Sequence, residues 1–128
     1  MNSVTAIRIT LKTGATVFGF SAVLLLFLPS VFIDLLALTQ SEALSWAMRM
    51  IGITLVALTG NMFLVATTAT DHGVYRAAIV MMISATTLGA LTLLIPVDLN
   101  LFTAGYAAIG FGFGLTYATL LMRTNQPR

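Results

Sequence analysis

The sequence predicts an all-α membrane protein in which four transmembrane helices form one bundle. Hydrophobic residues make up 59% of the chain and charged residues only 8%, whereas soluble domains carry about 25% charged residues. The apolar residues form long continuous runs rather than short alternating strands, which favours helical spans over a membrane barrel. No polar segment is long enough to separate two domains, so residues 1–128 are expected to form one.

The first span covers about residues 13–34 and is interrupted by Pro29. Two geometries are open at this proline. It kinks one continuous helix, or it begins a second short helix, because proline is well tolerated in a first helical turn. In the second case the apolar residues after Pro29 predict a short amphipathic helix that lies in the membrane interface.

The other three spans each have about 20 residues, enough to cross a hydrocarbon core of about 30 Å. Thr39 and Glu42 stand three residues apart before the second span, which predicts a capping box there. Asp71 is expected to cap the third span. The expected spans cover about residues 43–68, 75–95 and 101–122.

The cations are distributed unequally between the two sides of the predicted bundle. If the N-terminus is inside, the outer side carries only Arg49. The inner side carries five cations: Arg8, Lys12, Arg76, Arg123 and Arg128. Because inner loops of membrane proteins are enriched in Lys and Arg, we expect a multi-pass protein of the bacterial inner (cytoplasmic) membrane with both termini in the cytoplasm.

The composition argues against several classes of chemistry. The chain has no cysteine, which excludes thiolate and iron–sulfur sites, and its scattered cations form no nucleic-acid patch. The single histidine, His72, has only Asp71 beside it, too few ligands for a metal, and no serine lies in a nucleophile-elbow sequence. We therefore expect no enzyme activity, catalytic residue or metal site. No cofactor is evident, although a bound lipid, quinone or pigment remains open.

Two polar residues within or near the spans are candidate sites. Asn61 lies inside the second span, where we expect an interhelical hydrogen bond, with a polar ligand pathway as the alternative. Arg49 lies near the outer interface, where it is expected to pair with Asp34, Glu42 or Asp98. Binding of an anion or a lipid headgroup is the alternative for Arg49.

The fourth span has small residues on two nearly opposite sides. One ridge is Ala104, Ala108 and Gly112, and the other is Gly110, Gly114 and Ala118. Small ridges let helices approach closely in lipid. One ridge is expected to pack inside the bundle and the other against a partner, and we expect bulky residues at Gly110 or Gly114 to release that partner. Internal packing of both ridges is the alternative.

Several segments resemble the DoxX-like and related small bacterial four-helix membrane proteins. The similar segments are Leu26-Phe27-Leu28-Pro29 with Phe32-Ile33-Asp34-Leu35-Leu36, Ala47-Met48-Arg49-Met50-Ile51-Gly52 with Gly60, Thr70 to Arg76, and Leu88-Gly89-Ala90-Leu91. The resemblance covers about residues 14–95. It implies a four-helix bundle with both termini inside and a recurring outer arginine at Arg49. It implies no single activity, although some DoxX-type proteins are membrane partners of redox proteins.

These observations favour a small accessory or scaffolding subunit of a membrane assembly. Its expected partners are membrane lipids and other membrane-protein subunits or copies of itself, and no nucleic acid is expected. The alternative is an oligomeric transporter or channel for a small solute.

Overall fold

The computed structural model describes residues 2–124, so Arg128, which entered the charge count, lies outside the described residues. The described part of the chain contains five helices and no strand, and four of the helices are long and apolar enough to cross a membrane. The predicted all-α architecture with four spans is confirmed. The helices are α1 (Ser3–Phe27), α2 (Pro29–Leu35), α3 (Glu42–Thr68), α4 (Asp71–Leu93) and α5 (Leu101–Thr124).

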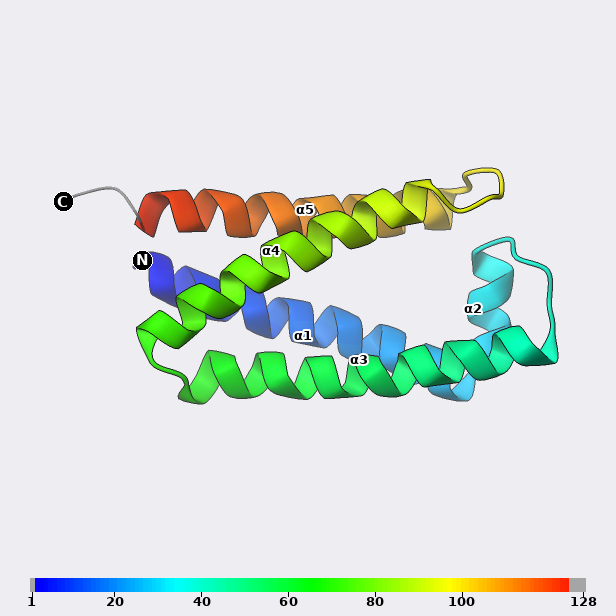
Figure 1. The fold of residues 1–128 in the computed structure, drawn as a ribbon, viewed down its shortest axis with the longest axis horizontal. Coiled ribbons are helices and arrows are strands. Elements are labelled where there is room, and N and C mark those ends of the chain that lie inside the picture. The colour runs from blue at the N-terminus through cyan, green and yellow to red at the C-terminus, as the bar shows by residue number, and fades with distance from the viewer. Residues whose placement is uncertain (1, 125–128) are drawn as a thin grey trace.

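The first predicted span is two helices. α1 begins at Ser3, ten residues before the expected start, and Asn2 caps it by accepting a hydrogen bond from the Val4 amide. α1 and α2 are separated at Leu28, and Pro29 is the first residue of α2. Of the two geometries open at the proline, the second short helix is correct, and it runs across the end of the bundle (Figure 1).

α2 ends in a tight turn. Ala37 adopts a left-handed backbone conformation with φ of 57°, and its amide donates to the Asp34 carbonyl. The amide of Leu38 donates to the Ile33 carbonyl. These two bonds form a Schellman motif, in which glycine is the usual left-handed residue.

The caps of α3 and α4 differ from those predicted. Ser41, rather than Thr39 with Glu42, caps α3 by accepting a hydrogen bond from the Leu44 amide at 3.1 Å. Thr70 caps α4, so Asp71 and His72 lie in its first turn and the helix begins four residues earlier than expected. In both helices the hydroxyl residue directly before the first helical residue is the cap, two residues from the predicted cap in α3 and one residue from it in α4.

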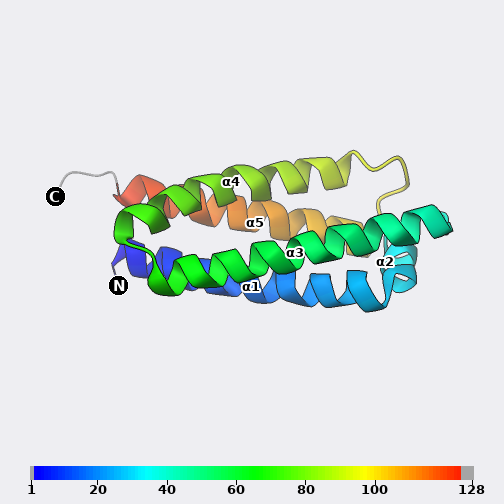
Figure 2. The same ribbon diagram turned by 60° about the horizontal axis from the view of Figure 1, so that its bottom comes forward.

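The four long helices form two closely packed antiparallel pairs. α1 packs along α3, α4 packs along α5, and the two pairs meet mainly through α1 and α5 (Figures 1 and 2). Gly52 of α3 lies against α1, where an added Cβ atom would come within 3.2 Å of the Leu26 amide nitrogen. α3 and α4 touch little beyond the turn that connects them.

The two ends of the bundle differ. At the end called here the terminal end, α1 begins, α5 ends and the turn between α3 and α4 lies (Figure 1). At the opposite end, called the α2 end, α2 lies beside the connection between α4 and α5. The side chain of Asn100 in that connection donates to the Leu35 carbonyl at 2.9 Å and so joins it to α2.

Two apolar clusters form the core. The larger one, nearer the terminal end, contains Phe18, Met81 and Tyr117, and the smaller one, at the α2 end, contains Leu25, Phe32, Ile33, Leu36 and Met48. Large apolar side chains remain exposed on all four long helices. Such exposure is expected of helices whose outer faces contact lipid.

Candidate functional site

The two small-residue sides of α5 have different surroundings. Gly110 and Gly114 are buried against α4. A Cβ atom added at Gly110 would lie 2.8 Å from the Gly89 amide nitrogen and 2.9 Å from the Ala85 carbonyl oxygen, and one added at Gly114 would collide with the Thr86 hydroxyl. Gly110 and Gly114 therefore form the contact between α4 and α5. The expectation that bulky residues there would release a partner is corrected. Ala118 is half-buried on the same side.

The opposite side of α5 is exposed, and we call Ala104, Gly105, Ala108 and Gly112 the exposed α5 face. No atom lies within 4 Å of a Cβ built at Gly105 or Gly112. A shallow hollow of about 260 Å³ lies at Gly112, between Ile109, Phe113 and Thr116. The exposed α5 face thus offers backbone and room to a neighbouring helix.

Asn61 does not make the expected interhelical hydrogen bond. Its side chain is exposed on α3, and its amide nitrogen donates to the Ala57 carbonyl of the same helix at 2.9 Å. The interhelical bond was expected because Asn61 was assumed to face the bundle interior. Asn61 instead lies at a hollow of about 200 Å³ between α3 and α4, beside Leu58 and Val80, and the local bond to Ala57 partly satisfies the amide there.

Arg49 is exposed near the start of α3, and its guanidinium carbon lies 5.3 Å from the centre of the Trp46 ring. The single ion pair within residues 2–124 lies elsewhere, so the expected pairing of Arg49 with an acid is replaced by a cation–π contact along one helix. Asp34 accepts a hydrogen bond from Gln40 instead.

Arg8 has a structural role that its place in the sequence did not indicate. Its guanidinium donates to the carbonyls of Ala66 and Ala69 at 3.0 and 2.7 Å, and it pairs with Asp71 at 3.1 Å. Ala66 lies in the last turn of α3, Ala69 is the residue that caps its C-terminal end, and Asp71 is the first residue of α4. Arg8 therefore satisfies carbonyls that a helix end leaves free and fixes the corner where the two helix pairs join.

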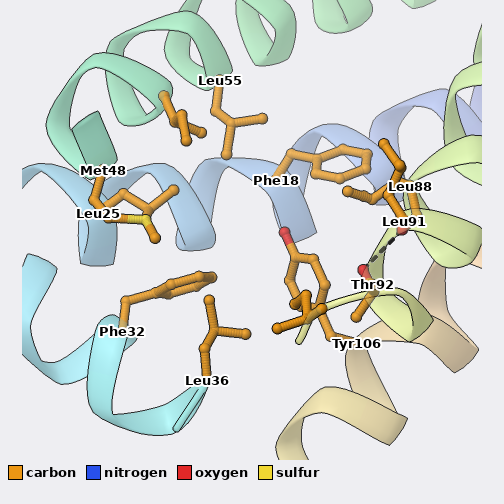
Figure 3. Close-up of a pocket in the computed structure, with 12 residues that line it drawn as sticks. Phe18, Leu25, Phe32, Leu36, Met48, Leu55, Leu88, Leu91, Thr92 and Tyr106 are labelled. Carbon is orange, nitrogen blue, oxygen red and sulfur yellow. Dashed lines mark hydrogen bonds between the residues drawn. The ribbon is translucent and has the colours of Figure 1, made fainter. Parts of the chain in front are cut away.

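An apolar cavity of about 270 Å³ lies between the two helix pairs in the half of the bundle toward the α2 end (Figure 3). Every helix contributes to its lining, and we call it the inter-pair cavity. Its lining residues are Phe18 and Leu25 of α1, Phe32 and Leu36 at α2, Met48, Ile51 and Leu55 of α3, Leu88, Leu91 and Thr92 of α4, Ile95, and Tyr106 of α5.

The two hydroxyl groups in this lining have partners within the protein. Thr92 donates to the Leu88 carbonyl at 2.7 Å (Figure 3, dashed line). The Tyr106 hydroxyl points toward α1, where the Ser21 side chain is its hydrogen-bond partner. No sequence pattern indicated this cavity, because its lining is almost entirely apolar and is drawn from segments far apart in the chain.

Within residues 2–124, no group of three or more histidine, cysteine or acidic residues is placed to hold a metal ion. His72 is exposed in the first turn of α4. Comparison of the chain with models of protein families, with curated proteins and with solved structures gives no match.

Proposed function

We propose that this protein is a small membrane subunit that packs, through the exposed α5 face, against a transmembrane helix of another membrane protein or of a second copy. The alignment of Ala104, Ala108 and Gly112 on an uncovered side of α5 carries this proposal. Small residues at four-residue spacing let helix backbones approach closely in lipid, where dispersion and interhelical contacts drive association. The hollow at Gly112 adds room for a large side chain of the partner.

The polar groups inside the bundle support a packing role more than a path for a solute. Ser21, Thr92 and Thr103 are buried, and each hydroxyl donates to an acceptor one helical turn earlier or at a helix cap. These three hydroxyls are satisfied within their own helix or cap, so none of them is left to bind a passing molecule, whereas the buried Tyr117 hydroxyl has no partner within residues 2–124. The resemblance of residues 14–95 to DoxX-like proteins, some of which accompany redox proteins, supports the same role.

We propose that the protein lies in the bacterial inner membrane with both termini in the cytoplasm. Among the described residues, four cations lie in the half toward the terminal end, whereas Arg49 lies toward the α2 end. Those four are Arg8, Lys12, Arg76 and Arg123. Such an imbalance supports a cytoplasmic terminal end. A reporter that works only in the cytoplasm should be active when it is fused after the C-terminus. Activity of a reporter that works only in the periplasm, fused at the same place, would reverse the orientation.

The assembly role is tested by the matched variants Gly112→Leu and Gly60→Leu. Gly60 is an exposed helical glycine on α3, and a Cβ atom built there also meets nothing within 4 Å. Each variant therefore adds the same side chain at a site that is open in the isolated chain. The protein is extracted from its native membrane in a mild detergent and its assemblies are weighed by native mass spectrometry.

We expect the wild-type chain and Gly60→Leu to occur in the same complex and Gly112→Leu to occur largely as the free chain. A wild-type monomer with no other polypeptide would refute the assembly role. Loss of the complex in Gly60→Leu but not in Gly112→Leu would move the interface from α5 to α3. The mass of the complex distinguishes a homo-oligomer from an assembly with another protein.

A further inference from the structure

The inter-pair cavity interrupts the core of the bundle. Phe18 on one side of it belongs to the larger core cluster, and Leu25, Phe32 and Met48 on the other side belong to the smaller one. Protein interiors are packed as densely as organic crystals and contain few voids larger than a water molecule. An apolar space of about 270 Å³ deprives its walls of contacts that a filling molecule would restore.

The lining restricts the chemistry of a filling molecule. Its hydroxyls, those of Thr92 and Tyr106, already have partners in the protein, and its other side chains are hydrocarbon or thioether. Water needs two to four polar partners to occupy a cavity stably. A hydrocarbon group fits these walls, whereas water or a polar solute does not.

The mouth of the cavity faces the side of the bundle. Ile51 of α3 and Leu91 of α4 line the cavity and are also 49% and 58% exposed. They lie on the two helices that touch little beyond their connecting turn. Because α3 and α4 are membrane-spanning segments, the medium outside this mouth is the hydrocarbon of the bilayer.

We propose that the inter-pair cavity binds one acyl chain of a membrane phospholipid, which enters laterally between Ile51 and Leu91. An apolar cavity of about 150 Å³ binds a benzene molecule, so a cavity of about 270 Å³ has room for a segment of hydrocarbon chain somewhat larger than benzene. The chain therefore inserts over part of its length while its headgroup stays in the interface. Phospholipid is the occupant because it is the hydrocarbon that surrounds this mouth in a bilayer.

The test closes the mouth and compares it with a matched control. The double variant Ile51→Phe/Leu91→Phe enlarges both mouth residues. The control, Ile53→Phe/Leu93→Phe, carries the same substitutions two residues further along the same helices. Ile53 and Leu93 are similarly exposed, 58% and 46%, but do not line the cavity. The full-length proteins are extracted in mild detergent, and phospholipid bound per chain is counted by native mass spectrometry.

We expect the wild type and the control to retain one phospholipid per chain, and the mouth variant to retain at least tenfold less. A second measurement keeps the protein in a bilayer, with phospholipid that carries a nitroxide near the end of one acyl chain. The wild type and the control should show about one more motionally restricted lipid per chain than the mouth variant, above the restricted lipid at the outer faces that all three proteins share. Unchanged circular dichroism of both variants excludes misfolding as the cause.

Several results would overturn the proposal. Equal retention by the mouth variant and the control would show that bound lipid lies elsewhere. No retained lipid in the wild type, together with no excess of restricted lipid over the mouth variant, would show that the cavity has no lipid ligand. Retention of an isoprenoid quinone in place of phospholipid would reject phospholipid as the source of the chain. A polypeptide partner that covers Ile51 and Leu91 would reject lateral entry of lipid.

Discussion

Substitution of Gly110 by alanine tests how closely α4 and α5 approach. The added methyl group would lie 2.8–3.0 Å from backbone atoms of α4, at Gly89 and Ala85. These atoms belong to a helix backbone and are not the flexible end of a side chain, so they move only if the two helices separate. Gly112, two residues further along α5, provides the matched control because nothing lies within 4 Å of its added methyl group.

The expected loss of unfolding free energy follows from the distance that the two helices must move apart. Ordinary contact of a Cβ atom begins at 3.4 Å, so α4 and α5 must separate locally by about 0.6 Å, which forfeits roughly a quarter to a half of the dispersion energy of the affected contacts. Overpacking of this kind costs about 1–3 kcal/mol. Both alanine variants gain helix propensity of about 0.8–1 kcal/mol over glycine. The unfolding free energy of Gly110→Ala should therefore lie about 1–3 kcal/mol below that of Gly112→Ala.

The comparison requires the purified, monomeric chain, so that any partner at the exposed α5 face does not contribute. Unfolding in mixtures of mild detergent and sodium dodecyl sulfate is followed by circular dichroism and by the fluorescence of Trp46, the single tryptophan. Equal unfolding free energies of the two variants would refute the close α4–α5 approach. A larger loss for Gly112→Ala would show that the two sides of α5 are exchanged.

Three further predictions use the same unfolding measurement. Arg8→Met should lower the unfolding free energy by about 1–3 kcal/mol because it removes charged donors from two carbonyls at the end of α3. Asp71→Asn, at a carboxylate that is 74% exposed, should lower it by less than about 1 kcal/mol. Equal losses would show that the ion pair is the main contribution of Arg8. Tyr117→Phe should leave stability unchanged or raise it by up to about 1 kcal/mol, because the buried hydroxyl has no partner within residues 2–124; a clear loss would reveal a partner. Ala37→Gly should raise stability by up to about 1 kcal/mol because it relieves a positive φ, and a decrease would show that the alanine methyl group contributes more than the strain costs.

Hydropathy was sufficient to find the four spans because apolar length is a direct physical requirement of a bilayer. It placed the start of α1 ten residues late, because Arg8 and Lys12 lower the local hydropathy. Ile7 and Leu11, between and beside these charges, are nevertheless fully buried. The helix extends through the charged segment because Arg8 finds its partners on α3 and α4, more than fifty residues away in the sequence.

The candidate site shows a different limit of prediction from the sequence. Periodicity identified two small-residue sides on α5 but had no means to tell which one meets α4, because that depends on where Gly89 and Ala85 lie in space. The same limit applies to Asn61, whose depth in the membrane was readable while its direction around α3 was not. Arg49 had an aromatic partner three residues away, at Trp46. That contact was within reach of the sequence, because residues at this spacing are neighbours on a helix surface.

Each closely packed pair of helices is made from one continuous stretch of chain, and this has a consequence for biosynthesis. Residues 2–68 contain both members of the first pair, so α1 and α3 can pack before α4 has left the ribosome. The partners of Arg8 end at Asp71, so the guanidinium acquires its last contact just as the second half begins to emerge. Contacts between segments close in sequence favour fast formation with little time in open intermediates. The order of synthesis therefore allows the first pair to close before the second pair is complete.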